Sequence, residues 1–381
     1  MAIISGFASI CLLLVVLLDG FETMVLPRRV TRRFRLTRLV YRTLWLPWRA
    51  VALELRPGKT RENFLSMFGP LSILLLIACW MTALTISFAW LHWSLATVLQ
   101  TPGDESGWGD YLYMSGTTIF TLGFGDVVPR DGVGRFLAVV EAGTGFAFMA
   151  VVIGYLPVLY QAFSRRETII SMLDARAGSP PAGGELLLRA AHSRDLEAIR
   201  RFLQDLEQWS AEVLESHLSF PVLSFYRSQH DNQSWVAALT ASLDACALLI
   251  SLLKGVAHYQ AQLSFAMARH AAVDLALVFH VPPQPLDENR WHGDAMAKLR
   301  EEMQSAGLSL HEEAAAAAKF AELRAMYEPF LLALGRYFVF SVPPVWRDTE
   351  VVDNWQTSAW MRRTAGINKL SAQPPQDDHF V

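Results

Sequence analysis

The stretch Thr118-Ile-Phe-Thr121-Leu-Gly123-Phe-Gly125-Asp126 decides how this chain is interpreted, because it lies between two long apolar segments, residues 70–95 and 136–163. Backbone carbonyls can replace the water shell of an ion inside a membrane. For successive carbonyls to point the same way, the chain needs dihedral angles that residues with a Cβ avoid, and Gly123 and Gly125 permit those angles. The stretch therefore predicts a backbone segment that coordinates a cation at membrane depth.

The stretch fills every constrained position of the pattern T-x-x-T-x-G-[Y/F]-G-D, and it resembles the selectivity filter of the potassium channel pore family. The resemblance covers residues 69–163. It implies an outer helix, a re-entrant pore helix at 111–120, a filter and an inner helix, with four copies around one pore. It also implies K⁺ as the permeant ion, coordinated by carbonyls of Thr121, Leu122, Gly123 and Phe124, with Gly125 permitting the geometry, Asp126 bracing the outer end, and Thr117 and Thr118 supporting the filter.

Two filter positions depart from the commonest pattern of that family. Phe124 replaces a tyrosine and so lacks a hydroxyl that can bond to the pore helix, which puts the rigidity of the filter in doubt more than its selectivity. Leu122 replaces the usual valine, which is a milder change.

Composition favours a membrane protein. The 381 residues are 52% hydrophobic and only 18% charged, and the net charge of −3 hides a strong segregation along the chain. Residues 2–18 form a further apolar run of spanning length. A cleaved signal peptide is the alternative for this run, but charge before it and a small-residue cleavage site after it are missing. The fold class expected is an all-α membrane protein with three transmembrane helices and an α-helical cytosolic domain.

A basic stretch follows the first apolar run and predicts the orientation, because Lys and Arg stay on the cytoplasmic side. Residues 1–68 thus comprise the first helix, with its N-terminus outside, and a basic interfacial linker of the plasma (inner) membrane. The linker is either a topology signal alone or a binding site for anionic lipids; nucleic-acid binding is not expected. Its basic residues are Arg28, Arg29, Arg32, Arg33, Arg35, Arg38, Arg42, Arg49, Arg56, Lys59 and Arg61.

Further features near the pore bear on the gate and the filter. Gly145 lies where the resemblance places a hinge glycine, and Gly154 with Pro157 forms a second weak point of the inner helix. Close helix packing is the alternative role for these glycines. Glu141, an ionisable group at membrane depth, is expected to hydrogen-bond behind the filter to Ser115 or Thr117, or else to face the cavity. His92, near Trp90 and Trp93, is expected at the outer interface, and Asp104, Glu105 and Asp110 at the pore mouth.

The C-terminal half reads as a helical domain of residues 185–370, after a linker at 164–184 and before a disordered tail at 371–381. Helices are expected from Ser193 onward and over 234–254, 256–281, 294–304 and 310–338. Residues 236–253 are apolar enough to imitate a fourth span, but Asp244 lies at their centre. A buried helix of the cytosolic domain is therefore expected there.

Candidate chemistry in this half is sparse. His270 and Asp274 are one helical turn apart and could share a metal ion, although packing or capping explains such a pair equally well. The three cysteines lie in apolar runs. No phosphate loop, nucleophile elbow or dinucleotide fingerprint occurs, so neither an enzyme nor a cofactor is expected. The alternatives to a potassium channel are a non-selective monovalent cation channel and a membrane-anchored helical scaffold or signalling protein with a non-conducting pore.

Overall fold

The computed structural model describes residues 2–26, 35–102, 106–193, 196–230, 232–255, 257–291 and 293–347. The chain divides into two units, each described by itself below. The first unit comprises Met1–Glu54 and Met67–Gln161, and the second comprises Leu55–Ser66 and Ala162–Val381. The predicted disordered tail at 371–381 and the acidic residues Asp104 and Glu105 lie outside the described residues.

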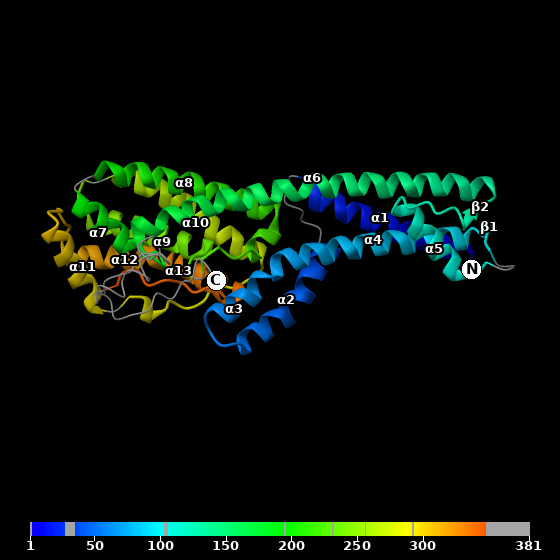
Figure 1. The fold of residues 1–381 in the computed structure, drawn as a ribbon. Coiled ribbons are helices and arrows are strands. Elements are labelled where there is room, and N and C mark those ends of the chain that lie inside the picture. Colours follow the sequence, from blue (N-terminus) through cyan, green and yellow to red (C-terminus); the bar gives the residue numbers. More distant parts are fainter. Residues whose placement is uncertain are drawn as a thin grey trace, which may run out of the picture. The chain divides into compact units, whose positions relative to one another are not determined.

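The first unit is built on long apolar helices (Figure 1). The predicted spans correspond to α1 (Ala2–Met24), α4 (Phe68–Ser94) and the first part of α6 (Gly132–Ala177), and α2 (Leu36–Glu54) occupies the basic stretch. Between α4 and α6 lie the short α5 (Trp108–Ile119) and a two-stranded antiparallel sheet of β1 (Leu99–Gln100) and β2 (Val128–Pro129).

A single apolar cluster holds α1, α4, α5 and α6 together. Its centre is Trp80 of α4, which packs edge-on against Phe148 of α6 at a centroid distance of 5.8 Å. Ile119, the last residue of α5, belongs to the same cluster and is fully buried. The end of α5 is therefore fixed by the packing of its neighbours.

Asp19 of α1 supplies a polar connection beside this cluster. Its Oδ2 accepts hydrogen bonds from the backbone N–H of Thr37 at 3.0 Å, from the Thr37 hydroxyl at 2.6 Å and from the Trp80 indole at 3.0 Å. The carboxylate is fully buried. One side chain thus joins α1, the first turn of α2 and the middle of α4, so the first helix is an integral part of this unit.

Helix α6 is 46 residues long, about 69 Å at 1.5 Å per residue. It runs without a break through Pro157 and ends at Ala177, although the sequence predicts a linker from 164. The Gly- and Pro-rich residues 177–184 are the basis of the predicted linker, with a short helix expected before them, and the charges at Arg165 and Arg166 mark the predicted end of the spanning helix. Ile169, Ile170 and Leu173 continue the helical spacing beyond them, and Ile170 and Leu173 are buried, so the charges do not end the helix.

The second unit is also helical. It contains α3 (Lys59–Ser66), the end of α6, α7 (Gly183–Ser193), α8 (Leu196–Ser219), η1 (Pro221–Phe225), α9 (Trp235–Leu252), α10 (His258–Val278), η2 (Glu288–Arg290), α11 (Gly293–Ser305), α12 (Glu313–Ala325) and α13 (Glu328–Phe338). The single helix predicted over 310–338 is wrong, because the chain breaks between α12 and α13. Pro329 lies in the first turn of α13, where its missing N–H is tolerated.

Helix α9 lies at the centre of the second unit, contacting α7, α10, α12 and α13. Four helices of the described residues are long and apolar enough to cross a membrane, and α9 is one of them. However, 94% of the apolar stretch of α9 is buried inside the protein, whereas only 22–50% of the corresponding stretch is buried in the other three helices. A helix covered on all sides by protein has no face left for lipid, as the interpretation of 236–253 expects.

Candidate functional site

The backbone of residues 121–126 adopts the angles that the glycine spacing requires. Gly123 has a φ of +56° and Gly125 a φ of +79°. A Cβ added to either glycine would meet no atom within 4 Å, so the requirement for glycine is conformational and not one of space. Thr121 also has a positive φ, +55°, which the sequence did not indicate.

The end of α5 holds the start of this segment. The carbonyl oxygen of Thr117 accepts hydrogen bonds from the N–H groups of Leu122 at 2.8 Å and Gly123 at 3.2 Å, and the carbonyl of Thr118 accepts one from Thr121 at 2.9 Å. The N–H groups of 121–123 thus bond to α5, which helps to fix the turn into the segment.

A side-chain hydrogen bond fixes the outer end. The Tyr113 hydroxyl, on α5, donates to Oδ2 of Asp126 at 2.9 Å. Sequence reasoning assigned a bracing role to Asp126 but missed its partner. The available signal was an aromatic hydroxyl on the predicted pore helix, Tyr113.

Glu141 is fully buried, as are Ser115 and His92. Its Oε2 lies 3.8 Å from Nε2 of His92, whose Nδ1 bonds to the Thr97 hydroxyl at 3.0 Å. No hydrogen bond to either Glu141 oxygen is present among the described residues, although Ser115 of α5 lies close enough to interact with the carboxyl group. The His92 side chain points into the protein beside Glu141 and not toward solvent or lipid, and its expected position at the outer interface stays a prediction. A filter-supporting role of Glu141 stays a prediction.

The glycines of α6 differ in their surroundings. A Cβ at Gly145 would overlap the backbone carbonyl of Ile119 at the end of α5, whereas Cβ atoms at Gly143 and Gly154 would meet nothing within 4 Å. Gly145 thus allows close packing of α6 on α5, the alternative that the sequence left open. Hinge roles for Gly145, Gly154 and Pro157 stay predictions.

Large apolar side chains around residues 121–126 are exposed in the single chain. Leu122 is 56% exposed and Phe124 66%, and on α6 Val139 and Phe146 are 72% and 69% exposed. Contiguous exposed apolar surface marks contact with lipid or with other chains.

These features agree with a comparison of the sequence with known families. Residues 72–161 match the family model described as "Ion channel". The match confirms the resemblance expected for 69–163. It covers the first unit from α4 onward and leaves α1, α2 and the second unit without a family.

Curated relatives add a membrane location but no activity. An uncharacterized membrane protein, YdjJ of Bacillus subtilis, is 26% identical over 210 residues, which are 53% of this chain and 58% of the relative. Protein LctB of Geobacillus stearothermophilus is 33% identical over 84 residues, 19% of this chain and 62% of the relative. The chain spans less than two thirds of the length of these relatives. No solved structure matches.

In the second unit, the end of α6 is anchored through Arg166, which is buried. The guanidinium donates to the backbone oxygens of Leu223 at 2.8 Å and Tyr226 at 2.9 Å. The backbone oxygen of Arg166 accepts a hydrogen bond from the Trp209 indole at 3.0 Å. Side chain and main chain are both held, so the end of α6 is built into this unit.

Helix α3, the segment that precedes α4 in the chain, is held by Arg227, the residue after Tyr226. Arg227 donates to the backbone oxygen of Phe338 at 2.7 Å and forms an ion pair with Glu62 of α3 at 3.5 Å. Since Tyr226 binds Arg166 and Arg227 binds Glu62, two adjacent residues of the second unit contact both chain segments that lead into the first unit.

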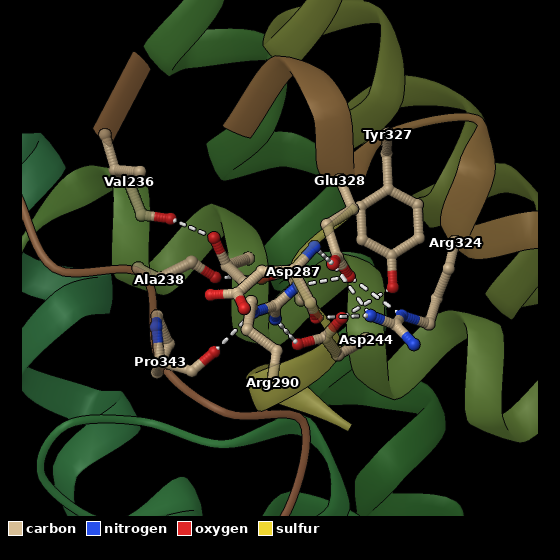
Figure 2. A network of polar contacts seen from close by, with 11 residues as sticks. Val236, Ala238, Asp244, Asp287, Arg290, Arg324, Tyr327, Glu328 and Pro343 are labelled. Carbon is tan, nitrogen blue, oxygen red and sulfur yellow. Dashed lines mark hydrogen bonds and ion pairs between the residues drawn. The ribbon is translucent and has the colours of Figure 1, made fainter. Parts of the chain in front are cut away.

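A buried charge network fills the centre of the second unit (Figure 2). Arg290 bridges Asp244 at 2.6 Å and Glu328 at 2.5 Å, Arg324 also binds Glu328, at 2.7 Å, and the Tyr327 hydroxyl donates to Asp244 at 2.5 Å. Two arginines balance two carboxylates, so each charge has partners. This network joins α9, η2, α12 and α13.

The candidate metal pair is not extended by further ligands. His270 Nδ1 and Asp274 Oδ1 are 3.9 Å apart on the surface of α10. Within the described part of the chain, three His, Cys, Asp or Glu side chains nowhere gather closely enough to hold a metal ion.

Proposed function

We propose that this chain is one subunit of a homotetrameric potassium channel, with residues 121–126 as the selectivity filter. The observation that carries the proposal is the pair of positive φ angles at Gly123 and Gly125, in a loop tied to α5 at both ends and placed between α4 and α6. In this role the carbonyls of Thr121, Leu122, Gly123 and Phe124 coordinate K⁺ in place of water.

The exposed apolar side chains support the assembly of several copies. One loop supplies only part of a ring of carbonyls, so four copies are needed to surround an ion. Leu122, Phe124 and Phe146 would then be covered by neighbouring subunits or lipid. The spanning helices in this proposal are α1, α4 and α6, with the N-terminus outside, the second unit in the cytoplasm and the basic α2 along the inner leaflet, in reach of anionic lipids.

A flux assay on the purified chain in liposomes tests the proposal. Potassium influx should exceed sodium influx, and barium should block it. Gly125→Ala, reconstituted at the same protein-to-lipid ratio, gives the baseline for a filter that cannot adopt its conformation. Equal potassium and sodium flux above that baseline would replace the proposal with a non-selective cation channel. Wild-type flux equal to the Gly125→Ala baseline would mean that the chain does not conduct ions, and would favour a membrane-anchored scaffold.

A further inference from the structure

A mostly apolar pocket of about 190 Å³ lies in the second unit, where the last turn of α6 meets α7 and α8. Its apolar wall is formed by Leu186, Leu187, Ile199, Phe202 and Leu203. The pocket is partly open to solvent, and Arg176 of α6 and Arg189 of α7 also line it.

The two arginines differ in what they bind. The Nε of Arg189 bonds to Glu185 at 2.5 Å, and its Nη1 donates to the backbone oxygen of Ala175 at 2.9 Å. Arg176 lies with its guanidinium carbon 4.6 Å from the centroid of the Phe202 ring, and its Nη1 donates to the oxygen of Met172 at 3.1 Å. Among the described residues no carboxylate pairs with Arg176. It therefore retains N–H donors beside an apolar pocket.

Size and charge together define a ligand class. A cavity of about 150 Å³ lined by Leu, Ile and Phe is large enough to bind benzene, and this pocket is lined by the same residue types. A guanidinium binds carboxylate and phosphate oxygens through several N–H groups at once. We propose that the pocket binds a small organic anion, namely a carboxylate or phosphate carried on an apolar body about the size of a benzene ring.

The position of the pocket gives such a ligand a structural effect. Ala175 and Arg176 belong to the last turn of α6, and the opposite walls belong to α7 and α8. A bound anion would therefore join the end of α6 to the two helices that follow it. Any effect on conduction rests on the proposed function, whereas binding itself does not.

Binding is measured on the purified full-length chain in a neutral detergent, by isothermal titration with phenylacetate and phenyl phosphate, and with benzyl alcohol as the uncharged analogue. Arg176→Gln should weaken binding of both anions about tenfold or more, because a charge-assisted contact is lost, and leave benzyl alcohol unchanged. Ala198→Leu, which fills the pocket without changing its charge, should weaken all three.

Arg200→Gln is the matched control, since it removes one positive charge from α8 outside the pocket lining. Equal weakening by Arg200→Gln and Arg176→Gln, or unchanged binding in Arg176→Gln, would overturn the proposal. Competition with dodecyl phosphate distinguishes the sources of the anion. Displacement of phenylacetate indicates a lipid-derived ligand with an acyl chain, and no displacement indicates a soluble aromatic one. Because no ion flux is measured, failure here leaves the channel proposal standing, and the reverse also holds.

Discussion

Arg166 of α6 donates a hydrogen bond from Nη1 to Nε2 of His217 on α8, at 3.3 Å. The other ring nitrogen, Nδ1, donates to the backbone oxygen of Val213 at 2.7 Å. His217 is fully buried and its ring packs against that of Trp235, 5.0 Å away. This geometry requires a neutral imidazole with its proton on Nδ1, because a proton on Nε2 would face the N–H of a guanidinium.

We expect the contact between α6 and α8 to weaken in acid. Burial, and after it the charge of Arg166, lowers the pKa of His217 well below its usual value. Below about pH 6.5 the unfolded chain therefore binds a proton that the folded chain does not, and stability falls by about 1.4 kcal/mol at one pH unit below. Hydrogen exchange of α8 amides, corrected for intrinsic rates, should show faster opening at pH 5.5 than at 7.5.

The control for this prediction is His270→Gln, because His270 is an exposed histidine of the same unit. It should keep the acid-dependent opening, whereas His217→Gln, which can still accept from Arg166, should lose most of it. Acid-dependent opening of α8 that persists unchanged in His217→Gln would show that another group is responsible.

Gly125→Ala should abolish potassium flux without preventing insertion or assembly. The φ of +79° costs a residue with a Cβ about 1–2 kcal/mol, and no neighbour obstructs the added methyl group. The strain therefore acts on the conformation of the filter and not on packing. Flux in liposomes and oligomer size in detergent are the measurements, and potassium-selective flux at the wild-type level would contradict the filter assignment.

Gly145→Ala separates packing from a hinge. Its Cβ would overlap the carbonyl of Ile119, so we expect a loss of stability of about 1–3 kcal/mol or more. Gly143→Ala, two residues away in open space, should be neutral or slightly stabilising. Thermal unfolding in detergent compares the two. A hinge without a packing role would leave the stability of both variants unchanged and alter only the flux of Gly145→Ala.

Tyr113→Phe should destabilise the outer end of the filter, because Asp126 loses its 2.9 Å hydrogen bond. The loss is expected to appear as faster decay of potassium current in single-channel or macroscopic recordings. Tyr111→Phe is the matched variant, since the Tyr111 hydroxyl bonds to the backbone of Thr97 and not to the filter. Equal decay in both variants would assign the effect to the outer loop.

Arg290→Met should be strongly destabilising, because it leaves Asp244 and Glu328 buried without their shared partner. Breaking such a buried pair costs about 3–5 kcal/mol. Arg200→Met removes an arginine whose partner Glu197 is exposed, and should change stability little. Chemical unfolding of the full chain measures both values. Similar losses of unfolding free energy in the two variants would mean that the network of Figure 2 contributes little to the stability of the second unit.

Sequence reasoning located the elements that depend on local signals. The positive φ angles of Gly123 and Gly125, the apolar helices and the buried character of α9 all follow from residue type and spacing within a short window. The end of α6 was misplaced because charges mark the edge of an apolar span, whereas a helix continues as long as its buried face does.

Contacts across helices were not accessible in the same way. Tyr113 with Asp126, His92 with Glu141, and Arg166 with Leu223 join residues whose meeting depends on how each helix is rotated about its axis. Hydropathy places a helix in a membrane or core but fixes this rotation only loosely. Arg227 with Glu62 joins residues far apart in the chain, and no sequence pattern relates them.

The three hydrogen bonds to Asp19 have a consequence for the order in which the protein is made. The carboxylate emerges from the ribosome near the end of α1, directly after the apolar run of residues 2–18 and before any of these partners exists. An unpaired carboxylate beside such a run is unfavourable. Thr37 follows 18 residues later, and Trp80 follows 61 residues later. We therefore expect α1 to pair with α2 first during synthesis, and to reach its final position only after α4 has been made.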